Sequence, residues 1–225
     1  MLAASSMQEA LTEVAEAWAE QDHAIPVLSF AASSAIARQV ESGAPADVVV
    51  TADAEWMDWL GERGLINAGS RRNVAGNMLV LIARRTNPQP VYAGPVEALE
   101  AYSGRLAMGE PAAVPAGRYA REALIALGMW DRVEARVVPA ENVRAALALV
   151  EQGEAGLGIV YASDAQASDK VAVVAVFAPD SHSTITYPAA LIARSEHPDA
   201  RAFLDVLGGA QGQAILRAHG FTAAP

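Results

Sequence analysis

Short apolar segments alternate with amphipathic helical segments along nearly the whole chain, and this alternation limits the possible folds severely. Segments of strand length and apolar composition include residues 25–30, 47–51, 78–83, 105–108 and 157–161. Between them, apolar residues recur at the three-to-four-residue spacing of a helix, as in Met7–Trp18. Such alternation is typical of α/β proteins, in which helices cover both faces of a sheet. We therefore expect an α/β fold with mostly parallel sheets and helices on both faces.

Two extended stretches, residues 78–83 and 184–193, mark where the chain is expected to cross from one lobe to the other. They suggest two α/β lobes, the first built from both ends of the chain. We expect residues 1–80 and 187–225 to form lobe I and residues 81–186 to form lobe II, with the two extended stretches as crossover strands that serve as a hinge. The proline-rich segment 84–95, which contains Pro88, is predicted to be a connection into the second lobe.

Composition excludes several classes of function. The net charge of −10 argues against binding to nucleic acid, which requires basic patches. The chain lacks cysteine, so disulfides, thiolate metal sites and a cysteine nucleophile are impossible. The four histidines have no metal-ligand spacing, and no serine lies in a Gly-x-Ser-x-Gly motif. These absences argue against an enzyme. The sequence also does not predict a membrane-spanning protein, because no apolar run reaches the roughly 18 residues that a bilayer requires.

Only Met1 and Leu2 precede the first sequence motif of interest. The N-terminal residues include neither the basic region nor the long apolar region of a signal peptide. We interpret the sequence as a mature or trimmed form that lacks part of its first strand.

The tetrapeptide Ala-Ala-Ser-Ser occurs twice, at residues 3–6 and 31–34. Each copy follows a short apolar segment and precedes a helical pattern. The spacing of about 28 residues fits one βαβ unit, so both copies are expected at the same end of one sheet. Helix N-termini have unpaired N–H groups and a partial positive charge, and therefore bind anions. The repeat indicates either a cradle for a small anion or two ordinary helix caps.

Three later segments have the same ambiguity. Residues 114–117 (Val-Pro-Ala-Gly) precede a helix. They are either a site where backbone N–H groups approach an anion closely or an ordinary helix start that contains proline. In residues 139–143, another strand-to-helix junction, Glu141 or Asn142 is suited to cap the helix. Tyr161 ends an apolar strand and is either a core aromatic residue or a hydroxyl donor.

Several segments, in order along nearly the whole chain, match one protein family. They are residues 3–6, 30–39, 43–47, 52–53, 56–58, 76–77, 114–117, 139–144, 146–151, 157–161, 163–164, 180–182 and 187–188. On these segments the chain resembles the periplasmic molybdate-binding proteins of bacterial ABC importers, which have the two-lobed fold of type II solute-binding proteins. The resemblance implies a periplasmic monomer that binds molybdate, and also tungstate, in the interlobe cleft. It also implies delivery to an inner-membrane ABC permease, with no cofactor.

The resemblance further implies which residues bind the oxyanion. They are Ser5, Ser33, Ala116, Val143 and Tyr161. The serines would donate hydroxyl and backbone N–H groups, Ala116 and Val143 would donate backbone N–H groups, and Tyr161 would donate its phenolic O–H. Molybdenum would be present only within the oxyanion, with no direct protein ligand.

The second serines of the repeated motif, Ser6 and Ser34, are expected to cap the helices. Alternative functions are a binding protein for another tetrahedral oxyanion such as sulfate, or an oxyanion-sensing regulatory domain. Discrimination against sulfate is expected to come from cavity size, because donors fixed by helices do not shrink onto a smaller ion.

Overall fold

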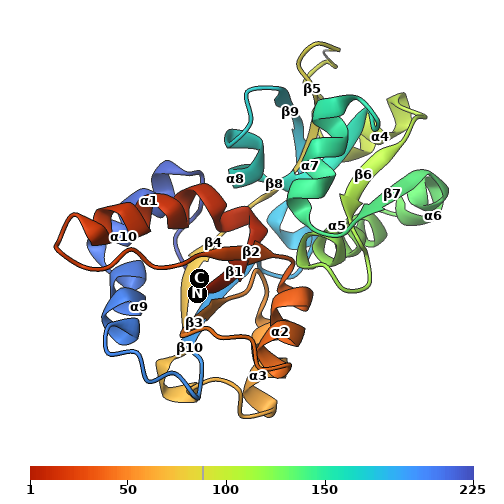
Figure 1. The fold of residues 1–225 in the computed structure, drawn as a ribbon. Helices are drawn as coiled ribbons and strands as arrows, with labels where there is room; N and C mark the ends of the chain where they lie inside the picture. Colours follow the sequence, from red (N-terminus) through yellow and green to blue (C-terminus); the bar gives the residue numbers. More distant parts are fainter. Residues whose placement is uncertain (88) are drawn as a thin grey trace. The chain divides into compact units, whose positions relative to one another are not determined.

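The computed structural model describes residues 1–87 and 89–225, which divide into two compact units (Figure 1). Unit 1 contains residues 1–76 and 185–225, and unit 2 contains residues 77–184. The sequence-based boundaries lie at 80/81 and 186/187 instead. Each unit consists of one five-stranded sheet with helices packed against it.

The proline-rich segment 84–95 is not the connection between the units, because it lies inside unit 2. Pro88 itself is outside the described residues. On either side of it, the Arg85 N–H donates to the Lys170 carbonyl at 2.8 Å, and the Tyr92 N–H donates to the Val174 carbonyl at 2.8 Å. These bonds join the segment to the sheet of unit 2. Proline content alone could not distinguish such a surface loop from a linker.

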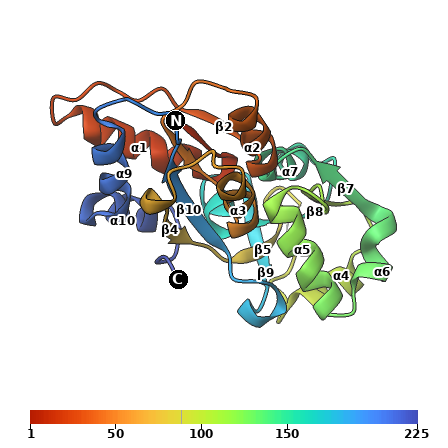
Figure 2. The same ribbon diagram turned by 90° about the horizontal axis from the view of Figure 1, so that it is seen from below.

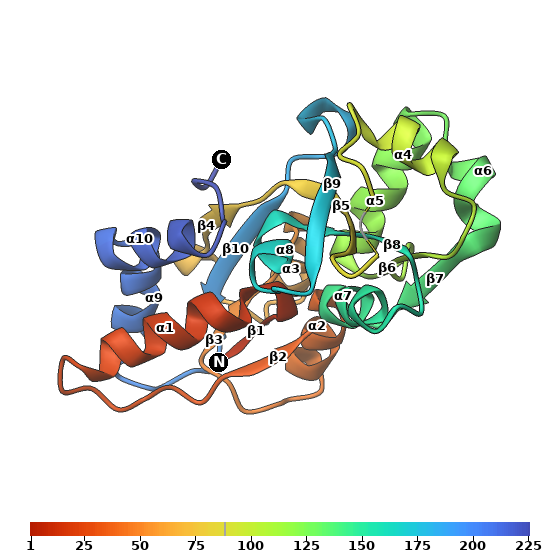
Figure 3. The same ribbon diagram turned by 90° about the horizontal axis from the view of Figure 1, so that it is seen from above.

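Unit 1 contains both ends of the chain. Its strands are β1 (Leu2–Ala4), β2 (Ser29–Ala31), β3 (Val48–Val50), β4 (Arg72–Gly76) and β10 (Thr186–Leu191). Its helices are η1 (Ser5–Met7), α1 (Gln8–Ala19), α2 (Ser33–Glu41), α3 (Ala54–Glu62), η2 (Ala68–Ser70), α9 (Ala200–Gly208) and α10 (Ala210–Ala218). Helices α1, α9 and α10 pack together beside β4 and β10 (Figure 3), whereas α2 and α3 pack on each other and against β1 and β10.

Unit 2 has the same kind of architecture. Its strands are β5 (Leu79–Arg84), β6 (Leu106–Gly109), β7 (Val137–Ala140), β8 (Leu157–Tyr161) and β9 (Val171–Val176). Its helices are α4 (Pro95–Ala101), α5 (Pro115–Ala126), α6 (Trp130–Val133), η3 (Glu134–Arg136), α7 (Val143–Gln152), α8 (Ala162–Gln166) and η4 (Pro179–Ser181). Helices α5 and α7 both contact β6 and β8, and they lie on opposite sides of β8 (Figure 2).

The α/β class is confirmed, but both sheets are mixed rather than mostly parallel. The strand orders are β2-β1-β3-β10-β4 and β7-β6-β8-β5-β9. In unit 1, β2, β1 and β3 are parallel, and β10 is antiparallel to β3 and β4. In unit 2, β7, β6 and β8 are parallel, and β5 is antiparallel to β8 and β9. The two stretches expected as hinge crossovers therefore each contribute the antiparallel strand of one sheet.

The core of unit 1 explains why these segments fold as they do. In α2, Ile36, Ala37 and Val40 recur at helical spacing, and all three are buried against β1, β3 and α3. Strand β3 is fully buried and consists of three valines, as expected for an interior strand of a sheet that is covered by helices. Within residues 1–87 and 89–225, no helix combines the length and apolar character that crossing a bilayer demands.

A buried hydrogen bond joins the N-terminal and C-terminal segments of unit 1. The hydroxyl oxygens of Ser6 and Tyr187 lie 2.9 Å apart, and both residues are buried. We expect Tyr187→Phe to lower the free energy of unfolding by about 1–3 kcal/mol, because it removes the hydroxyl that pairs with the buried Ser6 hydroxyl. Urea denaturation of the variant would measure this effect. Tyr92→Phe is the control, because the Tyr92 hydroxyl has no hydrogen bond to any described residue; an equal effect in both variants would contradict the prediction.

Candidate functional site

In unit 1, the two Ala-Ala-Ser-Ser motifs lie side by side at one edge of the sheet. Strands β1 and β2 are parallel neighbours, with Ala4 opposite Ala31 in the register. Ser5 follows directly after β1, and Ser33 begins α2 shortly after β2. The prediction that both junctions lie at the same end of one sheet is therefore confirmed. This carboxyl edge of parallel strands is the usual position of ligand sites in α/β sheets.

Ser33 is oriented by a third strand. Its hydroxyl oxygen accepts a hydrogen bond from the N–H of Ala52 at 2.9 Å, just after β3 ends, and the residue is 1% exposed. A hydroxyl that accepts one hydrogen bond retains its own proton for donation. As the first residue of α2, Ser33 also has a backbone N–H without an intrahelical partner. One residue therefore offers two donors at the sheet edge.

The second serines of the motifs are not helix caps, contrary to the sequence-based prediction. The N-cap positions are Ala4 for η1 and Ala32 for α2, and neither makes a side-chain capping bond. Ser6 and Ser34 lie inside the first turns of these helices, so their side chains are past the capping position. The Ser6 hydroxyl instead pairs with Tyr187, as described above. The N–H groups at these two helix starts are consequently not satisfied by side-chain caps.

In unit 2, Ala116 is the second residue of α5, after Pro115. The N–H of Ala116 has no carbonyl partner inside the helix because of its position in the first turn. The helix start is packed tightly on the end of β6: a Cβ atom added to Gly117 would lie 2.1 Å from the Gly109 carbonyl oxygen. A side chain at position 117 would push the helix away, so glycine fixes where the Ala116 N–H lies.

Val143 is the first residue of α7 and is buried. The cap of this helix is Asn142, whose side chain accepts the Ala145 N–H at 2.9 Å. This settles the choice between Glu141 and Asn142 that the sequence left open. Asn142 uses its oxygen on the third residue of the helix, so the N–H of Val143 is not consumed by the cap.

Tyr161 ends β8, and its backbone is fixed by a buried carboxylate. The Tyr161 N–H donates to Asp164 Oδ2 at 3.2 Å, and Asp164 Oδ1 lies 2.6 Å from Arg144 Nε. The sequence-based site did not include Arg144 or Asp164. The three-residue spacing between Tyr161 and Asp164 is a capping signal that reasoning from sequence could have used. The pairing with Arg144 on another helix had no local signal.

The three positions expected in unit 2 follow three parallel neighbouring strands. Gly109 of β6 lies opposite Ala140 of β7, and β6 is also paired with β8. Ala116, Val143 and Tyr161 come after β6, β7 and β8 respectively. Each unit therefore has a parallel three-stranded group whose carboxyl edge holds the expected donors, two in unit 1 and three in unit 2.

The chemistry of these five positions is that of neutral hydrogen-bond donors. None of them has a charged side chain, and all five are buried. Helix starts add partial positive charge at Ser33, Ala116 and Val143. Among residues 1–87 and 89–225, no group of three or more histidine, aspartate or glutamate side chains could hold a metal ion. In each unit, donors of this kind suit an anion with several acceptor oxygens.

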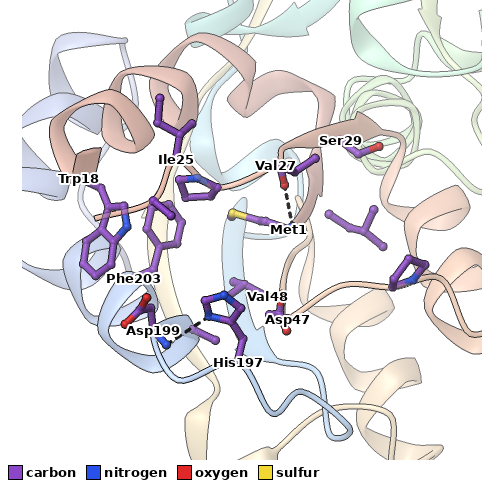
Figure 4. Close-up of a pocket in the computed structure, with 15 residues that line it drawn as sticks. Met1, Trp18, Ile25, Val27, Ser29, Asp47, Val48, His197, Asp199 and Phe203 are labelled. Atoms are coloured by element: carbon purple, nitrogen blue, oxygen red, sulfur yellow. Dashed lines mark hydrogen bonds between the residues drawn. The ribbon is translucent and has the colours of Figure 1, made fainter. Parts of the chain in front are cut away.

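An apolar pocket of about 340 Å³ in unit 1 lies near the opposite, amino ends of β1 and β3 (Figure 4). Trp18 and Phe203 form part of its wall, and the carboxylates of Asp47 and Asp199 are also in its lining. None of the five expected residues lines it. The walls are mostly apolar, and the two carboxylates outnumber the Met1 ammonium group, so this pocket suits an oxyanion poorly and is not the predicted site.

The same pocket explains why the strand observed here is shorter than the strand predicted at residues 25–30. Only Ser29 and Phe30 of that range belong to β2. Ile25 and Val27 lie in the pocket lining with exposed side chains. The Met1 ammonium group donates to the Val27 carbonyl at 2.8 Å. Burial of this amino group lowers its pKa below the ordinary value. The apolar pattern therefore marked a pocket wall rather than a strand.

The family model described as bacterial extracellular solute-binding protein matches residues 1–222. The chain belongs to this family. Among curated solute-binding relatives, the molybdate-binding protein ModA of Escherichia coli is 42% identical over 99% of this chain and 88% of its own length. ModA of Haemophilus influenzae is also 42% identical, over 99% of this chain and 89% of its own length.

A solved structure gives the fold of the solute-binding family. The periplasmic molybdate-binding protein of Azotobacter vinelandii superimposes with a TM-score of 0.89, covering 100% of this chain and 98% of that protein at 24% identity. The two-lobed solute-binding fold predicted from sequence is thereby confirmed. The family model and the two ModA relatives make the chain a solute-binding protein without a cofactor rather than an enzyme.

Proposed function

We propose that this solute-binding protein binds molybdate, and also tungstate, between its two units and delivers the anion to an ABC-type permease. The observation that carries the proposal is the pair of serine junctions at one sheet edge, with Ser33 held by the Ala52 N–H. The two relatives that are 42% identical are named as molybdate-binding proteins. These facts support Ser5, Ser33, Ala116, Val143 and Tyr161 as the oxyanion-binding residues.

Neutral donors suit a tetrahedral dianion in this protein. The chain has a net charge of −10, so its overall field repels anions, and attraction must come from local hydrogen bonds and helix starts. Hydrogen bonds to a charged group contribute roughly 1.5–3 kcal/mol each. The five donor positions, with two donors at each serine, would contribute roughly 10–20 kcal/mol in total. Most of this range exceeds the roughly 12 kcal/mol needed for nanomolar affinity. The excess offsets the cost of ordering the anion and the protein on binding.

The proposed transport step uses the two units of the fold. We propose that Ser5 and Ser33 first hold the anion and that hinge closure then adds the donors of unit 2. The closed form would be presented to the permease of the inner membrane. A periplasmic location belongs to the same proposal and is supported by the match to an extracellular solute-binding family. A monomeric state is also part of the proposal.

Isothermal titration calorimetry with four anions tests the proposed ligand. We expect nanomolar dissociation constants for molybdate and tungstate, and binding of sulfate and phosphate that is at least about tenfold weaker. Sulfate is smaller than molybdate and contacts fewer of the fixed donors, whereas a protonated phosphate needs an acceptor. Sulfate binding within tenfold of molybdate would contradict discrimination by cavity size. Absence of binding to molybdate and tungstate would overturn the proposed function.

A further inference from the structure

Arg144 and Asp164 form an ion pair in unit 2 between the starts of two helices. Arg144 is the second residue of α7, next to Val143, and Asp164 is the third residue of α8. Their closest atoms, Nε and Oδ1, are 2.6 Å apart. Asp164 is completely buried and the Arg144 side chain is only 20% exposed. The pair therefore lies in the interior, away from the surface where ion pairs contribute little.

Each partner of this pair has an unfavourable position by itself. A cation in the first turn of a helix opposes the partial positive charge of the helix start. A buried carboxylate is costly unless it is paired and hydrogen-bonded. Departures from local preferences of this kind are concentrated at functional sites. The position of the pair relative to the expected donors suggests what it does.

The pair connects two of the three donor positions of unit 2. Arg144 is adjacent in the chain to Val143, so holding the Arg144 side chain holds the first turn of α7. The second oxygen of Asp164 accepts the Tyr161 N–H at 3.2 Å, which holds the residue that ends β8. One carboxylate thus contacts both the helix that carries the Val143 N–H and the backbone of Tyr161.

We infer that the Arg144–Asp164 ion pair positions the Val143 N–H and the Tyr161 hydroxyl for one anion and neutralises a carboxylate that would otherwise repel it. This inference rests on the proposed function for the identity of the anion. Arg144 and Asp164 are positioning residues, because they act through Val143 and Tyr161. The pair adds no net charge, which agrees with a site of neutral donors.

The test compares Arg144→Gln with the wild type and with a matched control. Arg132→Gln is the control, because Arg132 forms an ion pair with Glu100 in the same unit but with both side chains about half exposed. We expect Arg144→Gln to raise the dissociation constant for molybdate at least tenfold and Arg144→Lys to restore part of the loss. Arg132→Gln should remain within twofold of the wild type.

Hydrogen exchange gives a second measurement that does not require a ligand. The protection of the Tyr161 amide, measured by NMR, should fall at least tenfold in Arg144→Gln and stay unchanged in Arg132→Gln. Unchanged protection, or molybdate affinity within twofold of a binding wild type, would overturn the inference. A wild type that binds no molybdate overturns the proposed function instead, and the exchange data still decide whether the pair holds Tyr161.

A double variant covers the case in which the unpaired carboxylate prevents folding. Arg144→Gln with Asp164→Asn buries no lone charge and can be checked for folding by circular dichroism. It should bind molybdate more weakly than the wild type, because a neutral pair holds the two helix starts less firmly. If Arg144→Gln does not fold, wild-type affinity together with wild-type Tyr161 protection in the double variant would overturn the inference.

Discussion

Replacing both Ser5 and Ser33 with alanine is expected to weaken molybdate binding by roughly 10²- to 10⁴-fold. Each substitution removes one hydroxyl donor to a charged ligand, which corresponds to about 1.5–3 kcal/mol, and two such losses add to about 3–6 kcal/mol. The effect is expected to be large because Ser33 is already oriented by the Ala52 N–H, so little entropy is lost when it donates. Isothermal titration calorimetry of the double variant measures the change.

Controls for this experiment come from the same motif. Ser34→Ala removes a hydroxyl from the second position of α2 but keeps every backbone N–H, and it should bind molybdate within about twofold of the wild type. The Ala52 N–H loses its acceptor in Ser33→Ala, so thermal unfolding of the apo variants is needed to separate stability from affinity. Unchanged affinity in the double variant would remove Ser5 and Ser33 from the proposed site.

The sequence predicted that the two serine junctions of unit 1 lie at the same end of one sheet, because the signal for this prediction is local. A repeated motif after each of two strand segments placed Ser5 and Ser33 at equivalent junctions, and the register of Ala4 with Ala31 makes those junctions neighbours. Strand direction was not predictable in the same way. The apolar strands β5 and β10 have the composition of buried strands in either direction, so their antiparallel pairing had no sequence signal.

Other features could not be predicted because they depend on long-range contacts. Strand β4 contains arginine, asparagine and glycine, which are poor strand signals, and it is stabilised by its pairing with the distant strand β10. The partner of Ser6 is Tyr187, 181 residues away, so the same serine looked like a helix cap. The Arg144–Asp164 pair likewise requires the short helix α8, which the sequence pattern did not indicate.

Val143→Pro is expected to weaken molybdate binding about 10- to 100-fold while leaving α7 intact. Proline is well tolerated as the first residue of a helix, where its missing N–H has no intrahelical partner. Asn142 has φ −157° and ψ 174°, which is the extended conformation that a residue before proline prefers. The substitution therefore deletes the one proposed donor at this position, worth about 1.5–3 kcal/mol toward a charged ligand.

Val143→Ala is the matched control, because it also shortens the buried side chain but retains the N–H. Calorimetry should show a clear loss of affinity in the proline variant and a much smaller loss in the alanine variant, with both proteins folded by circular dichroism. Equal losses in the two variants would mean that packing of the valine side chain, rather than its N–H, matters for binding. That result would remove the start of α7 from the set of anion donors, and with it the reason for holding this helix by a buried ion pair.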